Sequence, residues 1–145
     1  MKQQLATLIA TFFYVGKIPF ASGTFGSLAA LPLGMAFYHG IDFPSPMIGL
    51  IAGVIFSAII YAIGVWASDV YMAHTKTHDP SAIVIDEVAG QILALAIISP
   101  ILWGSDLSPE FRWMVLIGNF LLFRFFDIFK PWPVGWADKK LHNAH

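Results

Sequence analysis

The chain has 145 residues, 57% of them apolar and only 12% charged, and its mean hydropathy is +0.71. Soluble domains have about 45–50% apolar and about 25% charged residues, so the composition predicts a single integral membrane domain over residues 1–145. A net charge of −1 without any Lys/Arg run argues against nucleic-acid binding, and the absence of cysteine excludes disulfides and thiolate chemistry.

The first apolar residues recur at helical spacing: Leu5, Leu8, Ile9, Phe12 and Phe13. This pattern favours a short amphipathic helix lying in the membrane surface, with the first part of a transmembrane bundle as the alternative. Lys17 and Pro19 interrupt the apolar run before a signal-peptide cleavage site, so we expect the segment to be retained.

Small and hydroxyl residues at positions 19–27 precede the apolar run of residues 28–38. Thr24, Gly26 and Ser27 at a helix N-terminus would suit an anion such as phosphate, because free backbone N–H groups point at it. A glycine-rich loop with Ser27 as a plain helix cap explains the same residues, and these residues alone favour the cap. The Gly-Lys-Ser/Thr ending of a Walker loop is missing.

Residues 47–73 form a long apolar run whose small residues predict close helix contact: Gly49, Gly53, Ser57, Ala58, Gly64 and Ala67. Asp69 is expected near the membrane edge, beside the anchoring rings of Trp66 and Tyr71. In the linker that follows, His74 and His78 have the spacing of a zinc-binding pair, but a solvated linker accounts for them at least as well.

Asp86 and Glu87 stand at the start of residues 83–103, an apolar segment about long enough to span a bilayer. Carboxylates in such a segment usually face a polar cavity, a partner charge or a metal. Alternatively, they mark the interfacial first turn of a helix, where negative charge favours the helix dipole.

The last span runs from about Phe111 to residue 133, and Arg124 and Asp127 lie three apart on one face of it. They form either a salt bridge that neutralises two buried charges or an anion clamp beside a metal ligand. The predicted fold is an all-α bundle of about four transmembrane helices plus the interfacial amphipathic helix.

Lys and Arg are absent from the loops at residues 39–46 and 104–110, although Arg112 lies just past the second loop. The lysines of the chain fall on the opposite side of a four-span arrangement: Lys2, Lys17, Lys76, Lys130, Lys139 and Lys140. The positive-inside rule then predicts a multi-pass protein with both termini in the cytoplasm. This topology brings the polar positions from four separate parts of the chain to the cytoplasmic edge of the membrane.

Carboxylates and cations at the depth of lipid headgroups suit Mg²⁺ and a phosphate, since Mg²⁺ takes oxygen ligands and keeps several waters. The metal would neutralise charge and activate a water, while Arg124 and Lys130 would grip phosphoryl oxygens. The alternative is a small membrane transport or scaffold protein whose charges only hold helices together. That alternative does not explain why four polar segments share one membrane face.

Three blocks of the chain together resemble the phosphatidylglycerophosphatase A family: residues 23–30, residues 79–91 and residues 123–133. They occur in the family's order and cover the chain from about Gly23 to Leu141. The resemblance implies a Mg²⁺-dependent lipid phosphatase of the bacterial inner membrane with its active site facing the cytoplasm. Its substrate would be the phospholipid phosphatidylglycerophosphate, its product phosphatidylglycerol, and no protein partner is implied.

The resemblance also points to candidate residues, and the roles within this set are our hypothesis. The expected metal ligands are Asp79, Asp86, Glu87 and Asp127, with Asp127 as a ligand or as the base that orients the water. The expected phosphate cradle is Thr24, Gly26, Ser27, Arg124 and Lys130. Family members usually continue past the position of His142 into a second acidic motif and one more apolar helix. We therefore expect either a further helix outside this sequence or a metal site without that second carboxylate pair.

Overall fold

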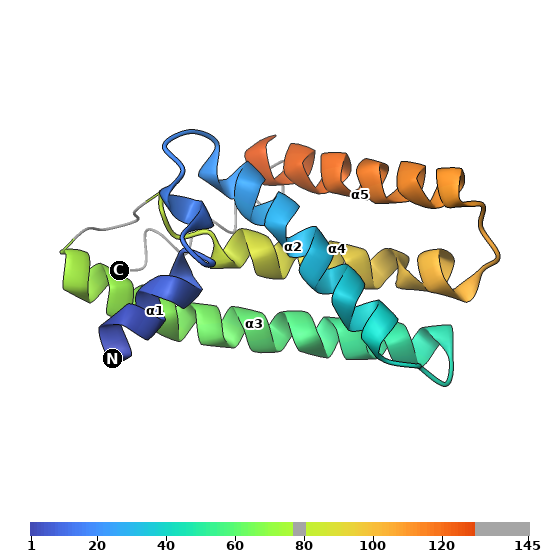
Figure 1. Cartoon of the computed structure of the whole chain (residues 1–145), viewed down its shortest axis with the longest axis horizontal. Helices are drawn as coiled ribbons and strands as arrows, with labels where there is room; N and C mark the ends of the chain where they lie inside the picture. The colour runs from blue at the N-terminus through green and yellow to red at the C-terminus, as the bar shows by residue number, and fades with distance from the viewer. Residues whose placement is uncertain (77–80, 130–145) are drawn as a thin grey trace.

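The computed structural model describes residues 1–76 and 81–129, and the regular structure of this part of the chain is helical (Figure 1). Its elements are α1 (Lys2–Ala10), the short 3-10 helix η1 (Val15–Lys17), α2 (Ser22–Gly40), α3 (Pro46–Thr75), α4 (Ile85–Gly104) and α5 (Pro109–Phe129). The prediction of an all-α protein is confirmed.

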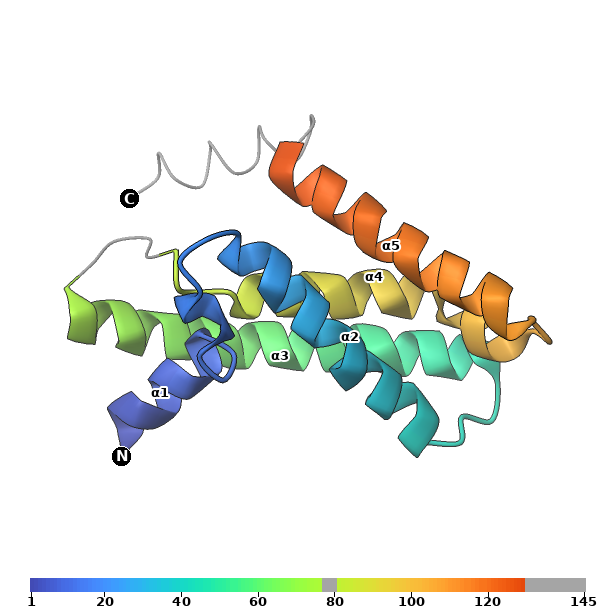
Figure 2. The same ribbon diagram turned by 45° about the horizontal axis from the view of Figure 1, so that its top comes forward.

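Helices α2 to α5 alternate in direction, as both views show (Figures 1 and 2). The starts of α2 and α4 and the ends of α3 and α5 meet at the end of the bundle where the N-terminus lies, which we call the N-terminal end. The loops at residues 41–45 and 105–108 lie at the opposite end. Segments that are far apart in the sequence therefore bring their terminal turns together.

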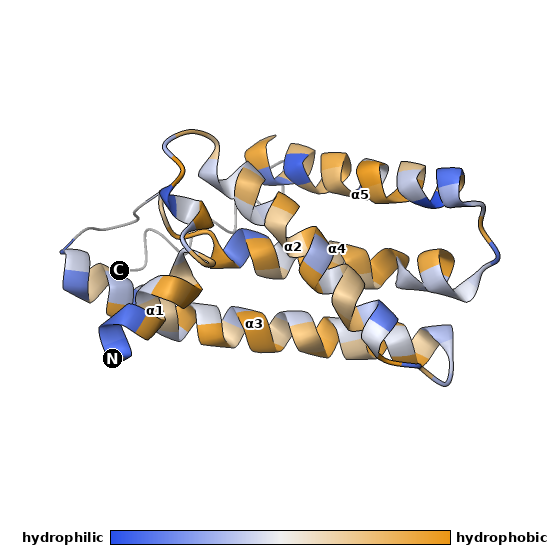
Figure 3. Cartoon of the chain, viewed as in Figure 1, coloured by the Kyte–Doolittle hydropathy of each residue, from blue (hydrophilic) through white to orange (hydrophobic). Residues whose placement is uncertain are grey.

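Two helices of the described residues, α3 and α4, are long and apolar enough to cross a membrane. The expected number of about four spans is not confirmed by this criterion. Large apolar side chains nevertheless lie exposed on the outward faces, among them Ile55 on α3 and Leu121 and Phe125 on α5. Figure 3 shows that hydrophobic residues recur along α3, α4 and α5. Exposed apolar surface of this extent is typical of a protein surrounded by lipid, which supports the membrane assignment.

Helices α3 and α4 pack closely along the predicted stripe of small residues. Gly49, Gly53, Ser57, Gly64 and Ala67 are all buried, as predicted, whereas Ala58 is exposed because it lies on another face of the helix. A Cβ at Gly53 would lie only 2.8 Å from the Cβ of Ala96, and the Ser57 hydroxyl donates a 2.7 Å hydrogen bond to the carbonyl of Ala89. Such short backbone separations are characteristic of membrane helix pairs.

Helix α1 confirms the short N-terminal helix but ends at Ala10, before Phe12 and Phe13. The chain turns there because Phe12, Phe13 and Tyr14 adopt positive φ angles of 43°, 55° and 67°. The turn places the carbonyl of Ala10 3.0 Å from the backbone nitrogen of Val84, which donates a hydrogen bond to it. The N-terminal segment is thereby fixed to the start of α4.

The interpretation of residues 19–27 as a loop capped by Ser27 is wrong, because α2 already begins at Ser22. The Ser27 hydroxyl donates a 3.0 Å hydrogen bond to the carbonyl of Gly23 within the helix. A Cβ at Gly26 would lie 2.9 Å from the Cβ of Val84. The small residues thus allow the first turns of α2 to approach the start of α4 closely.

We predict that Gly53→Ala lowers the melting temperature of the protein in detergent, because the added methyl group would overlap the hydroxyl of Tyr38 on α2 and the Cβ of Ala96 on α4. Overpacking of this kind typically costs about 1–3 kcal/mol. Gly118→Ala is the matched control, since no atom lies within 4 Å of a Cβ at that helical position. A Gly53→Ala protein as stable as the wild type would contradict the close packing of α3 and α4.

Candidate active site

Three helices meet at the N-terminal end around Gly23 of α2, Glu87 of α4 and Arg124 of α5. A Cβ at Gly23 would lie 3.1 Å from the carboxyl carbon of Glu87 and 3.4 Å from Nη2 of Arg124. The missing side chain at Gly23 therefore makes room for an acidic and a basic group beside the first turn of α2. The structure brings together the predicted acidic motif and the predicted basic-acidic motif at this point.

The guanidinium of Arg124 is held by two partners. It forms an ion pair with Asp127, and its Nη1 donates a 3.3 Å hydrogen bond to the hydroxyl of Ser27. The Arg124 side chain is only 12% exposed, and its Nε has no hydrogen-bond partner among the described residues. A buried guanidinium with unused donor capacity is suited to bind an anion that enters the site.

The residues of the predicted phosphate cradle that lie on α2 differ in how deeply they are buried. Ser27 is fully buried and accepts the hydrogen bond from Arg124, so it fixes the position of that side chain. Gly26 is buried against Val84, whereas Thr24 is half-buried in the first turn of the helix. Lys130, the remaining cradle residue, lies outside the described residues.

Three carboxylates face this region. Glu87 is half-buried and its Oε2 is a buried atom without a hydrogen-bond partner among the described residues. Asp86 is exposed, and both Asp86 and Asp127 are close enough to interact electrostatically with Glu87. Three carboxyl groups lie near the guanidinium of Arg124 in this part of the structure, and neighbouring carboxyl groups can hold a cation between them.

These oxygen atoms fit a Mg²⁺ site that is completed by substrate. No group of three or more His, Cys, Asp or Glu residues within residues 1–76 and 81–129 is placed to hold a metal ion. Mg²⁺ needs only one or two protein carboxylates when phosphate and water oxygens supply its other ligands. Asp86 and the unpartnered oxygen of Glu87 can provide them. Asp79, a further expected ligand, and His78 of the zinc alternative lie outside the described residues.

The sequence interpretation missed a buried polar pair next to the site, Gln91 of α4 and Asn119 of α5. Gln91 is fully buried, and its Nε2 donates a 2.9 Å hydrogen bond to Oδ1 of Asn119. Asn119 in turn donates a 3.0 Å hydrogen bond to the carbonyl of Ala94. Gln91 follows Glu87 by one helical turn, so this pair fixes α5 against α4 close to the carboxylates. The amide of Gln91 inside an apolar run could have been noticed in the sequence. Nothing in the sequence indicated that Asn119 would be its partner.

Comparison with known proteins adds independent information. Residues 8–145 match the family described as phosphatidylglycerophosphatase A. A Haemophilus influenzae protein of that name is 35% identical over 137 residues, which cover 94% of this chain and 74% of the relative. An Escherichia coli protein of the same name is 30% identical over 138 residues, which cover 94% of this chain and 69% of the relative.

A Bacteroides thetaiotaomicron protein, provisionally named a phosphatidylinositol-3-phosphatase, is 35% identical over 139 residues, covering 96% of this chain and 77% of the relative. No solved structure gives a significant match.

We predict that Asn119→Leu destabilises the protein by about 1–2 kcal/mol, because it leaves the buried amide of Gln91 without its partner. Adding Gln91→Leu should recover part of this loss, since no unpaired amide then remains. Unfolding free energies of the wild type, both single variants and the double variant form the test. Losses that simply add would show that the two amides are not coupled.

Proposed function

This chain belongs to the phosphatidylglycerophosphatase A family, and we propose that it hydrolyses the terminal phosphomonoester of phosphatidylglycerophosphate to phosphatidylglycerol and phosphate. Family membership makes the protein a phosphatase and favours an enzyme over the transport or scaffold alternative. The observation that carries the proposal is the meeting of Glu87 and Arg124 beside Gly23 at one end of the bundle. We further propose that the reaction depends on Mg²⁺.

The chain's own residues would divide the work of binding and orientation. Arg124, already held by Ser27 and Asp127, would donate its free N–H groups to the phosphoryl oxygens, which a planar guanidinium binds in bidentate fashion. Asp86 and Glu87 would hold Mg²⁺ through their carboxylate oxygens. When bound, that ion supplies charge neutralisation and lowers the pKa of a coordinated water.

Water is the proposed nucleophile. Its oxygen bonds to phosphorus while the bond between phosphorus and the glycerol oxygen breaks. One of the two protons of the water ends on the departing glycerol oxygen, and the other stays on the released phosphate. Asp127 is 32% exposed, so its carboxylate can orient the attacking water while it remains paired with Arg124. The terminal phosphate of the lipid enters at the headgroup depth of the membrane, where the first turns of α2 and α4 lie.

We propose that the N-terminal end of the bundle faces the cytoplasm of a bacterial inner membrane. Lys2 of α1, Lys17 of η1 and Lys76 after α3 lie at this end, whereas Arg112, in the first turn of α5, is the one Lys or Arg that the described residues place at the opposite end. This distribution supports cytoplasmic placement under the positive-inside rule. A cytoplasmic C-terminus is part of the same proposal, although the residues after Phe129 lie outside the described part of the chain.

The first test is phosphate release from phosphatidylglycerophosphate by the purified protein in detergent. We expect release with Mg²⁺ and loss of activity with a chelator, followed by recovery when Mg²⁺ is added back. Phosphatidylinositol 3-phosphate is the comparison substrate, because a relative carries that name, and we expect slower release from it. Equal rates with Mg²⁺ and with chelator would contradict metal dependence.

Glu87→Gln and Asp86→Asn should each lower kcat at least about 100-fold, because each removes a charged ligand while retaining the shape of the side chain. Asp106→Asn is the matched control, since Asp106 is exposed in a loop at the opposite end. Melting temperatures of all three variants establish that they are folded. Near-normal rates for Glu87→Gln would exclude Glu87 as a metal ligand.

Arg124→Lys should lower kcat/KM by about 10- to 100-fold, because a point charge replaces a bidentate fork and the contact with Ser27 is lost. Arg112→Lys provides the control on the same helix, as Arg112 lies in the first turns of α5 at the other end of the bundle. Equal losses for the two substitutions would contradict a specific role for Arg124.

A further inference from the structure

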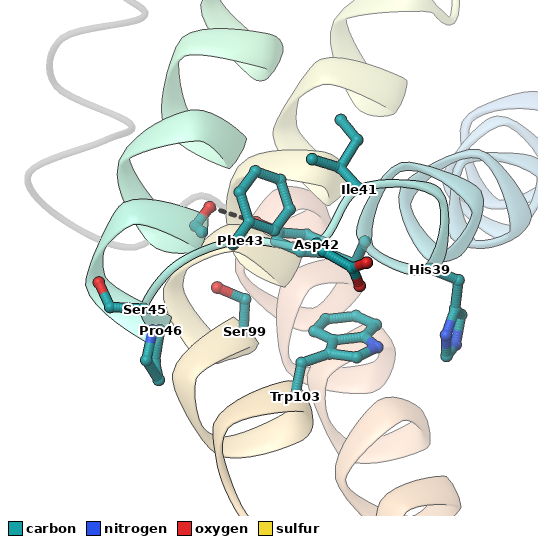
Figure 4. Close-up of a pocket in the computed structure, with 10 residues that line it drawn as sticks. His39, Ile41, Asp42, Phe43, Ser45, Pro46, Ser99 and Trp103 are labelled. Atoms are coloured by element: carbon teal, nitrogen blue, oxygen red, sulfur yellow. Dashed lines mark hydrogen bonds between the residues drawn. The ribbon is translucent and has the colours of Figure 1, made fainter.

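A pocket of about 330 Å³ lies at the end of the bundle opposite the candidate active site (Figure 4). It is formed where the end of α2, the loop at residues 41–45 and the start of α3 meet the last turns of α4. Glu87 and Arg124 belong to the other end, so this pocket is separate from the proposed site of hydrolysis. It also lies at the start of α3 and the end of α4, the two described helices long enough to span a membrane, so we expect it at headgroup depth.

Aromatic rings form one wall of the pocket. The rings of Tyr38 and Trp103 are stacked, with centroids 4.3 Å apart and an angle of 16° between planes, and the imidazole of His39 stands edge-on to Trp103 at 5.9 Å. Rings of this kind at the headgroup depth bind cationic groups through their faces.

The polar groups of the pocket are not all satisfied. Tyr38 donates a 3.3 Å hydrogen bond to the carbonyl of Gly49, and Ser99 donates a 2.8 Å bond to the carbonyl of Ala96. Nε1 of Trp103, in contrast, is buried without a hydrogen-bond partner among the described residues. A buried N–H group left unpaired is costly, so an acceptor atom on a ligand would be favourable here.

The charged residue among those that line the pocket is an acidic one, Asp42. The carboxylate of Asp42 lies beside Trp103 in Figure 4, and no Lys or Arg is among the residues that line the pocket. A carboxylate next to an aromatic face suits an ammonium group, whereas the indole N–H suits a phosphate oxygen. A zwitterionic phospholipid headgroup carries both groups only a few atoms apart.

We propose that this pocket binds a headgroup that contains an ammonium and a phosphate, as a zwitterionic phospholipid supplies it in the leaflet opposite the active site. Asp42 and the ring of Trp103 hold the ammonium, and the indole N–H of Trp103 binds the phosphate. The assignment does not depend on the reaction proposed above, because it rests on other residues at the other end of the bundle.

Calorimetric titration of the detergent-solubilised protein tests the proposal. The ligands are a short-chain lipid with a phosphoethanolamine headgroup, the same lipid with a phosphoglycerol headgroup, and free phosphoethanolamine. We expect the first to bind, the phosphoglycerol lipid to bind at least about tenfold more weakly, and Asp42→Asn to weaken binding of the first by a similar factor. Asp106→Asn is the control and should bind like the wild type.

Trp103→Phe retains a ring but removes the N–H donor, so it should also weaken binding of the phosphoethanolamine lipid. Melting temperatures show whether each variant is folded. If Trp103→Phe does not fold, Asp42→Asn still tests the proposal, because Asp42 lies at an exposed position in a loop. Equal affinity of the free headgroup would support the pocket and identify a soluble ligand. Wild-type affinity in folded Asp42→Asn, or equal affinity for both lipids, would overturn the proposal.

Discussion

The position of α5 depends on two polar contacts more than on apolar burial. Leu116 is the buried residue of this helix, packed near Leu95 and Leu102, while most of its large side chains face outward. Apolar side chains gain little by leaving lipid, so close packing and hydrogen bonds decide how membrane helices associate. Asn119 ties α5 to α4, and Arg124 ties it to Ser27 of α2. The second contact belongs to the candidate active site, so assembly of the bundle and of the site share one determinant.

Close approach of backbones is the complementary constraint. Gly53 permits the contact between α3 and α4, and Gly26 permits that between α2 and the start of α4. Gly23 has a different consequence, because the space left by its missing side chain faces Glu87 and Arg124. The small residues at the start of α2 therefore leave space for neighbouring groups. This space allows Glu87 of α4 and Arg124 of α5 to lie beside the first turns of α2.

The sequence predicted correctly those features that depend on the residue pattern of a single helix or on the order of the helices along the chain. The apolar run and small-residue stripe of α3 correctly predicted a long helix with Gly53 and Gly64 buried, and charge placement correctly predicted that Glu87, Arg124 and Asp127 gather at one end. Prediction from the sequence failed where the structure of a segment depends on its contacts with another helix. Residues 22–27 read locally as a loop but are helical because α2 packs against Val84, and the pairing of Gln91 with Asn119 requires the register between two helices.

The central claim is that chain segments far apart in sequence place their acidic and basic groups on one side of the membrane. The chain contains no cysteine, so single cysteines can be introduced at Asp86, Asp127, Asp42 and Asp106 and labelled with a membrane-impermeant maleimide in oriented vesicles. We expect cysteines at positions 86 and 127 to react from the cytoplasmic side and those at positions 42 and 106 to react from the other side. Labelling of positions 86 and 127 from opposite sides would contradict the account.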